Sequence, residues 1–239
     1  MNSIKGIIFD YGGTIDTNGI HWGELIWQEY CNANVCIDKV QFREAYVHGE
    51  RTLAKERIIE PTDTFQTLLR KKMNIQFGFL RENYTTETLT AQKEQEVADT
   101  CYQRVLKTIA TTRPIIEELG KRFPLVLVTN FYGNMPVVLH EFGLGHLFED
   151  IIESSVVGIR KPDPELFALG VKTLGIDCKE CVVIGDSYRK DINPAAQLGC
   201  RSVWLKKICW SEENIEAGLE PCDIIESLEE LPHIIDNYT

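Results

Sequence analysis

Residues 7–16, IIFDYGGTID, constrain the fold of this chain most strongly, because an apolar run ends there on a single carboxylate. The apolar residues between Ile4 and Phe9 are typical of a short strand buried inside a parallel sheet. Asp10 directly follows this run, and open α/β sheets bind their ligands at the carboxyl ends of strands. The segment therefore predicts a strand of an α/β sheet with a candidate nucleophile at its end.

Two glycines follow the carboxylate. Gly12 and Gly13 allow backbone conformations in which amide groups face an anion, and the hydroxyl of Thr14 adds a further donor. On its own, however, the segment still favours an ordinary strand that ends in a turn. Support for a catalytic site must come from other parts of the chain.

Two later apolar runs also end on polar side chains. Residues 124–130 close on Thr129 and Asn130, which carry a hydroxyl and an amide suited to holding phosphate oxygens. Residues 181–191 close on Asp186, and Asp191 follows five positions later. We expect these side chains to gather with Asp10 at one edge of a parallel sheet.

A basic residue lies between these two runs. Lys161 precedes a proline that fixes the turn into the next helix, in the segment at residues 158–167. Arg160 is its neighbour, and because only one of the two can easily point inward, we expect Lys161 to do so. The chain thus supplies one cation for a site that contains three acids.

This ordered set of motifs resembles that of the haloacid dehalogenase-like superfamily of hydrolases, most of whose members are magnesium-dependent phosphatases. Asp10 matches the nucleophile, Thr129 the phosphate-binding hydroxyl, Lys161 the basic residue, and Asp186 with Asp191 the paired acids. The text between the motifs is similar to the subgroup with an all-helical cap inserted between the first and second motifs. The resemblance covers nearly the whole chain and implies a Rossmann-like α/β core with a parallel sheet.

The chemistry of these residue types agrees with that resemblance. A carboxylate nucleophile can form an aspartyl phosphate, which divides one difficult displacement into two easier steps. Three converging carboxylates repel one another unless a hard cation such as Mg²⁺ lies among them. The resemblance implies metal ligands from Asp10, the Gly12 carbonyl and Asp186, with Asp191 orienting metal-bound water or Lys161. The predicted phosphate-binding set is Gly12, Gly13, Thr14, Thr129, Asn130 and Lys161.

Gly12 departs from the family pattern, because phosphatases of this family usually carry there a second Asp that acts as general acid and base. General acid–base catalysis is typically worth ~10²- to 10⁴-fold, so poor leaving groups would suffer most. Three hypotheses remain: a phosphatase of small phosphorylated metabolites whose acid comes from elsewhere or whose leaving group is good, another reaction on the same scaffold, or a weak phosphate-binding regulatory module.

The alternative reactions are a dehalogenase-like and a phosphonatase-like hydrolysis. Dehalogenases resemble the chain poorly at the pair formed by Asp186 and Asp191. Phosphonoacetaldehyde hydrolases carry a small residue at the Gly12 position but need a cap lysine for a Schiff base, for which Lys39 and Lys55 are the candidates in the early cap.

Asp16 and His21 lie on the segment that leads towards the cap. Asp16 could replace the missing acid, but a turn or helix-start carboxylate beside residues 17–19 is the favoured interpretation. A lone histidine in a loop is more often structural than catalytic, so His21 is expected to be so too.

The periodicity of the chain predicts two domains. Residues 1–16 and 109–239 are assigned to the core and residues 17–108 to the cap. The expected cap helices cover residues 22–32, 38–57, 62–73 and 90–108, and Pro114 is expected to begin a separate core helix. Further strands are expected at residues 151–153, 181–185, 202–205 and 223–225, and a final helix at 227–235.

Composition narrows the possible partners. The net charge of −11 argues against nucleic acid, and no 18-residue apolar stretch or export signal is present, so we expect a cytoplasmic protein without membrane association. The eight cysteines are therefore expected to be reduced and mostly buried, and the Cys178–Cys181 pair to be coincidental. The sequence does not decide between a monomer and a homodimer.

Overall fold

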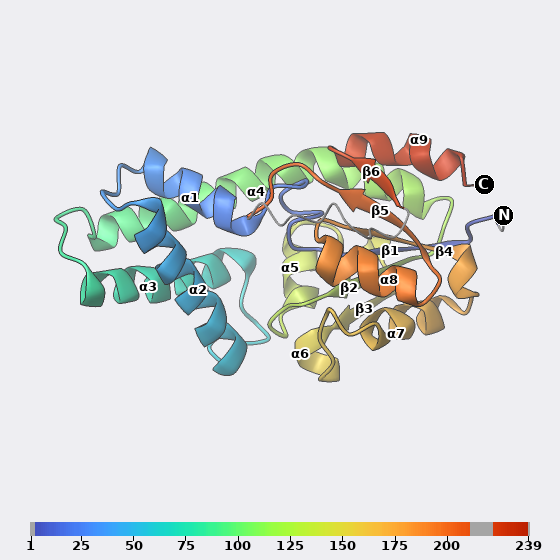
Figure 1. The fold of residues 1–239 in the computed structure, drawn as a ribbon, viewed down its shortest axis with the longest axis horizontal. Coiled ribbons are helices and arrows are strands. Elements are labelled where there is room, and N and C mark those ends of the chain that lie inside the picture. Colours follow the sequence, from blue (N-terminus) through green and yellow to red (C-terminus); the bar gives the residue numbers. More distant parts are fainter. Residues whose placement is uncertain (1–2, 211–221, 239) are drawn as a thin grey trace.

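Six parallel strands form the sheet at the centre of the core, in the order β3-β2-β1-β4-β5-β6. The computed structural model describes residues 3–210 and 222–238, and Figure 1 shows the core and the helical cap at opposite ends of its long axis. The strands are β1 (Gly6–Phe9), β2 (Leu125–Thr129), β3 (Asp150–Glu153), β4 (Cys181–Gly185), β5 (Arg201–Leu205) and β6 (Asp223–Ile225). The predicted α/β class and the predicted strands are confirmed.

Alternate side chains of these strands pack on opposite faces of the sheet. On one face, Ile7 and Leu127 pack in the same cluster as residues of α4 (Ala91–Gly120), α5 (Met135–Glu141) and α9 (Leu231–Asp236). On the other face, Ile8 and Val183 pack with residues of α7 (Glu165–Leu174) and α8 (Asn193–Gln197). The sheet is therefore covered by helices on both sides, which explains its continuous apolar runs.

The strand order reverses between β1 and β4. From β1 the chain proceeds outward through β2 and β3, then returns to place β4 on the other side of β1 before β5 and β6. Such a switch point leaves a crevice at the carboxyl ends of the two central strands. Asp10 and Asp186 each follow directly after one of these strands, so the topology alone brings them together.

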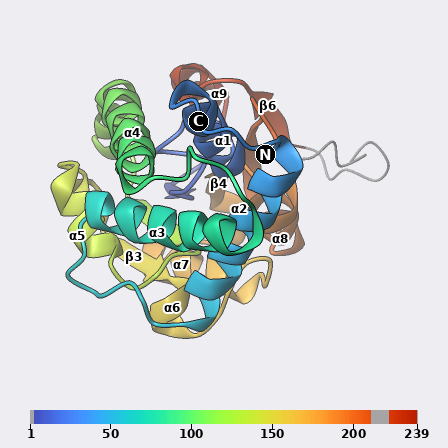
Figure 2. The same cartoon turned by 90° about the vertical axis from the view of Figure 1, so that its left-hand side faces the viewer.

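The cap consists of α1 (Trp22–Asn32), α2 (Lys39–Lys55), α3 (Phe65–Asn83) and the first part of α4. In Figure 2 these helices face the viewer, with α3 lying across α2 and below α4. The helix predicted at residues 22–32 has those bounds, whereas α3 begins three residues later than predicted and ends ten residues later. The remaining short helices are η1 (Gly145–Leu147), α6 (Ser154–Val157), η2 (Cys178–Glu180), η3 (Tyr188–Ile192) and η4 (Leu228–Glu230).

The expectation that Pro114 begins a separate helix is wrong, because α4 runs without interruption from Ala91 to Gly120. The buried stripe of this helix continues in phase on both sides of the proline, from Val105 to Ile116. Packing of that stripe offsets the roughly 3 kcal/mol that an interior proline costs. The predicted domain boundary at residues 108 and 109 thus falls inside one helix that spans cap and core (Figure 1).

Three of the eight cysteines are buried, namely Cys101, Cys181 and Cys200, so the expectation of mostly buried thiols is wrong. Among the described residues, no helix is both long enough and apolar enough to cross a bilayer.

Candidate active site

Asp10 lies at the carboxyl end of β1 with its carboxylate held on both sides. Lys161 Nζ lies 2.6 Å from Oδ1, and the hydroxyl of Thr14 donates to Oδ2 at 3.0 Å. The backbone N–H of Asp10 donates to the carbonyl of Ile184 on β4 at 2.9 Å, which continues the sheet pairing. Backbone and side chain are therefore both fixed before any substrate binds.

The turn after Asp10 depends on Gly13. This residue has a φ of +97°, and a Cβ at this position would lie 2.2 Å from a carboxylate oxygen of Asp186. Its N–H donates to Oδ1 of Asp16 at 2.7 Å, so that amide is already engaged. Gly13 thus allows the first and fourth motifs to approach each other, and Asp16 stabilises the turn from behind.

The side chain of Asn130 positions Lys161 through two hydrogen bonds to the Lys161 backbone. The side chain of Asn130 accepts from the Lys161 N–H at 3.0 Å and donates to the Lys161 carbonyl at 3.2 Å. The Lys161 ammonium also packs over the ring of Phe167, 4.9 Å from its centroid. Lys161 is buried, as expected, whereas Arg160 is exposed but also lines the cavity between core and cap.

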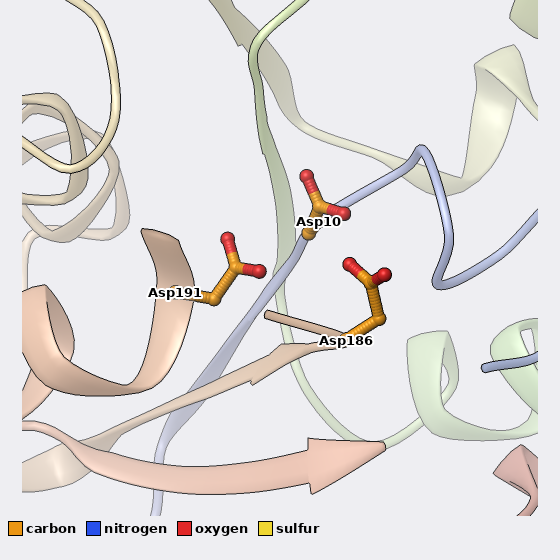
Figure 3. Close-up of side chains that lie close together, drawn as sticks. All are labelled: Asp10, Asp186 and Asp191. Atoms are coloured by element: carbon orange, nitrogen blue, oxygen red, sulfur yellow. The ribbon is translucent and has the colours of Figure 1, made fainter. Parts of the chain in front are cut away.

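Asp186 and Asp191 complete an acidic cluster with Asp10, and their carboxylates converge in Figure 3. One oxygen from each of the three lies within 4.8 Å of the others. Asp191 receives Lys161 Nζ at 2.7 Å on one oxygen and the Ser187 N–H at 3.0 Å on the other. The Lys161 ammonium thus pairs with Asp10 and Asp191, two of the three carboxylates in this cluster.

Burial, together with the neighbouring charges, shifts the pKa values of the carboxyl groups in this cluster. Burial raises the pKa of Asp10 to about 6, with Lys161 opposing the shift and Asp191 adding to it. The pKa of Asp186 is raised well above its ordinary value by burial and by the charges of Asp10 and Asp191. Oxygen donors with uncompensated charge fit a hard dication, so the residues present fit Mg²⁺.

The predicted site residues do not all line one cavity. A cavity of about 180 Å³ lies between core and cap. From the predicted set it is lined by Asp10, Gly12, Thr129, Asn130, Lys161, Asp186 and Asp191. Gly13 and Thr14 support the Asp10 loop from outside it. The volume is below the ~300 Å³ at which drug-sized pockets begin, which suits a small ligand.

Asp16 does not line this cavity. Its carboxylate is fully buried and accepts from the Gly13 N–H and from Trp22 Nε1, the latter at 2.9 Å. Burial raises the pKa of Asp16 to about 7 despite these two bonds. The interpretation of Asp16 as a turn carboxylate agrees with these contacts.

His21 does line the cavity, although it also has a structural role. Its Nδ1 accepts from the Gly23 N–H at 3.0 Å and so caps α1. Its ring stacks on Trp210 with centroids 5.5 Å apart. Burial lowers the pKa of His21 to about 4, so the neutral ring that caps the helix persists at neutral pH.

Sequence reasoning missed the polar residues that the cap contributes. Lys72 of α3 and Glu50 of α2 line the cavity and form an ion pair of 2.8 Å. The hydroxyl of Tyr132, from the loop after β2, donates to Glu50 Oε2 at 3.2 Å. The lysines named as Schiff-base candidates, Lys39 and Lys55, do not line the cavity.

Known proteins resemble this chain over nearly its full length. A family model described as haloacid dehalogenase-like hydrolase matches residues 4–199. The chain is 35% identical over 235 residues to the glyceraldehyde 3-phosphate phosphatase of Methanocaldococcus jannaschii, covering 98% of both proteins.

Two further similarities are local or structural. A stretch of 81 residues is 38% identical to the phosphoserine phosphatase of Thermus thermophilus, covering 34% of this chain and 28% of that protein. The crystal structure of the magnesium-bound HAD-hydrolase YfnB from Bacillus subtilis has a TM-score of 0.62 at 22% identity. That match covers 98% of this chain and 100% of the other, so the fold extends over cap and core.

Proposed function

Because the chain belongs to the haloacid dehalogenase-like hydrolases, we propose that it is a magnesium-dependent phosphohydrolase of a small phosphorylated metabolite. The observation that carries this proposal is the cluster of Asp10, Asp186 and Asp191 at the edge of a small cavity, with the Lys161 ammonium bonded to Asp10 and Asp191. The similarity to the glyceraldehyde 3-phosphate phosphatase of Methanocaldococcus jannaschii supports a phosphate ester as substrate.

Asp10 acts as the nucleophile in this proposal. A carboxylate oxygen of Asp10 attacks phosphorus, and the bond from phosphorus to the leaving alcohol oxygen breaks as an aspartyl phosphate forms. Water then attacks the same phosphorus, which releases phosphate and restores the carboxylate. Thr14 directs the Asp10 carboxylate through its hydrogen bond.

Lys161 and Thr129 bind the transferring phosphoryl group. The Lys161 ammonium neutralises part of the charge on the phosphoryl oxygens, where positioning and electrostatics supply most of the catalysis. The reciprocal bonds with Asn130 keep that ammonium directed at the cluster. Thr129 ends β2 at the cavity and offers its hydroxyl to the same oxygens.

Asp10, Asp186 and the backbone carbonyl of Gly12 would hold Mg²⁺, with Asp191 supporting them from its bonds to Lys161 and Ser187. When bound, the ion supplies positive charge next to the phosphoryl oxygens and relieves the repulsion among the carboxylates.

The missing acid at Gly12 restricts the substrates. Because no carboxyl group is present at this position, the loop after Asp10 supplies no proton to the leaving oxygen. That oxygen must depart unprotonated or take a proton from the substrate or from solvent. Good leaving groups tolerate this best. Asp16 lies behind the loop and is bonded to Gly13 and Trp22, so it is not poised to donate to the cavity.

A phosphonatase-like Schiff base would require a neutral cap lysine at the cavity. Lys72 is the cap lysine that lines it, and burial alone would lower its pKa, but Glu50 and the nearby tyrosines raise the pKa above the ordinary value. A protonated ammonium is not a nucleophile, so this reaction is disfavoured. The acid pair formed by Asp186 and Asp191 likewise disfavours dehalogenation.

Phosphate release from a panel of phosphate monoesters, measured with Mg²⁺ and with chelator, tests the proposal. The wild type should turn over only with Mg²⁺, and Asp10→Asn should be inactive. Asp150→Asn, an exposed aspartate at the start of β3, is the matched control and should behave as the wild type. No turnover together with tight phosphate binding would instead favour a regulatory module.

A further inference from the structure

Lys72 occupies a position where a charge is costly. It lies on the buried stripe of α3, among Leu68, Leu69 and Met73, and only 6% of its surface is exposed. Long charged side chains usually extend to water from such positions. The Lys72 ammonium instead meets Glu50 of α2 at 2.8 Å, at the wall of the active-site cavity.

Stability does not explain this pair. The Lys72 ammonium is buried, whereas the Glu50 side chain is 34% exposed, so the cost of desolvation falls mainly on Lys72. Replacing such a pair by apolar side chains of similar size avoids that cost and is often neutral or stabilising. The surrounding α2–α3 interface is already apolar, with Phe42 and Phe77 fully buried. The pair is therefore more readily explained by a ligand than by packing.

The pair offers a donor and an acceptor that face the same space. Lys72 stays protonated and Glu50 stays ionised, because each raises the preference of the other for its charged form. The Lys72 ammonium has three N–H donors. Glu50 receives Lys72 at Oε1 and the Tyr132 hydroxyl at Oε2, and a carboxylate oxygen can accept a second hydrogen bond. The net charge of the pair is zero, so it does not attract a further anion.

Two aromatic rings flank the Lys72 ammonium. The ring centroids of Trp22 and Tyr132 lie 5.8 Å and 5.7 Å from its nitrogen, and both side chains line the cavity. An apolar ring face beside paired polar groups suits an aliphatic chain that carries hydroxyls.

We propose that Lys72 and Glu50 bind a hydroxyl group on the alcohol part of the substrate, and that the substrates are phosphate monoesters of small polyols or sugars. The inference rests on the proposed phosphohydrolase function, with the phosphoryl group at Asp10 and the alcohol part extending towards α2 and α3. The hydroxyl accepts from Lys72 and donates to Glu50.

The test compares kcat/KM for glycerol 3-phosphate with that for propyl phosphate, which has the same chain length but no hydroxyls, and for 3-phosphoglycerate, which carries a carboxylate. We expect the wild type to prefer glycerol 3-phosphate over propyl phosphate by roughly 10- to 100-fold, as hydrogen bonds to charged groups allow. The double variant Lys72→Met/Glu50→Gln removes both charges together, and should reduce that ratio to near one.

A second ion pair made by a lysine of α3 provides the control. Lys71 pairs with Asp63 at 2.5 Å and neither residue lines the cavity. Lys71→Met/Asp63→Asn should therefore keep the wild-type ratio. Equal loss of the ratio in both double variants, a wild-type ratio near one, or a preference for 3-phosphoglycerate would each overturn the inference.

A binding measurement distinguishes failure of this inference from failure of the proposed function. In Asp10→Asn, which cannot turn over, calorimetry should show glycerol 3-phosphate binding more tightly than propyl phosphate, and the Lys72/Glu50 double change should remove the difference. If the wild type hydrolyses no phosphate ester but this binding preference is present, the proposed function fails and the hydroxyl site stands. If the wild type hydrolyses phosphate esters but the binding preference is absent, the proposed function stands and the hydroxyl site is overturned.

Discussion

The open space beside Gly12 ends at the indole of Trp22. A Cβ built on Gly12 would lie 4.0 Å from Trp22 Nε1, and apart from its chain neighbours no other described heavy atom is as near. The Trp22 N–H is already bonded to Asp16. The position usually taken by the second aspartate is thus sterically free, in contrast to Gly13, where a Cβ would meet Asp186.

Gly12→Asp should therefore fold and should raise phosphohydrolase activity. The new carboxyl group would supply the proton that alkyl leaving groups need, so turnover of alkyl phosphates should rise ~10²- to 10⁴-fold. Steady-state phosphate release measures the effect. Gly12→Asn, which has the same shape without an acidic proton, is the control, and an equal gain in both variants would contradict the prediction.

The wild type should discriminate strongly by leaving group. Without an acid at Gly12, aryl phosphates with activated leaving groups should be hydrolysed far faster than alkyl phosphates, because their oxygen departs unprotonated. The measurement is kcat/KM along a series of phosphate esters of increasing leaving-group pKa. With Mg²⁺ present, similar rates along the series would show that another group donates the proton.

Much of the core could be predicted because its polar residues end apolar strands. Asp10, Thr129 and Asp186 were identifiable in this way, since each closes a buried run and parallel strands bring such ends together. The parallel direction of the strands then follows from the helices that cross over between them, whereas the strand order is known only from the structure. Local sequence and global fold agree here.

The cap could be predicted only in outline. Lys72 lies in a lysine-rich stretch that is typical of an exposed helix face. Its burial is indicated only by its helical spacing from Phe65, Leu69 and Gln76, which form the buried stripe of α3. Glu50 similarly follows the buried Tyr46 by one helical turn. Helical spacing identifies the inward face, but which residues of two helices meet depends on how the helices pack.

Magnesium should stabilise the folded protein through Asp186. A ligand that binds only the folded state adds about 2.7 kcal/mol to the free energy of unfolding at one hundred times its Kd. Asp186→Asn should abolish that gain, and without metal it should be more stable than the wild type, because it removes one of three repelling carboxylates. Thermal unfolding with Mg²⁺ and with chelator measures both effects.

The control for metal binding is Asp150→Asn, which should keep the full response to Mg²⁺. A wild type whose unfolding temperature does not respond to Mg²⁺ would contradict the assignment of the cluster.

Thr112 links α4, the helix that spans cap and core, to the loop that follows Asp10. Its buried hydroxyl donates to the carbonyl of Ile15 at 3.0 Å. Thr112→Val leaves that carbonyl without its donor, so the free energy of unfolding should fall by about 1–3 kcal/mol. Urea denaturation measures the change, and Thr111→Val, at an exposed position whose hydroxyl bonds within the helix, should have a much smaller effect.

His21 should make stability depend on pH in the weakly acidic range. Burial lowers its pKa from 6.5 to about 4 in the folded protein. As the pH falls from 6.5 towards 4, the unfolded chain takes up a proton at His21 that the folded chain does not, so the free energy of unfolding decreases. The loss at pH 5 should reach about 2 kcal/mol, since each pKa unit corresponds to about 1.4 kcal/mol.

His21→Asn retains an acceptor for the Gly23 N–H at the start of α1 and removes the titrating ring. Urea denaturation at pH 7 and pH 5 should then show a pH dependence smaller than that of the wild type by the same amount. His233→Asn, an exposed histidine of α9, controls for loss of an imidazole elsewhere and should leave the dependence unchanged. An unaltered pH dependence in His21→Asn would mean that other groups cause the acid destabilisation.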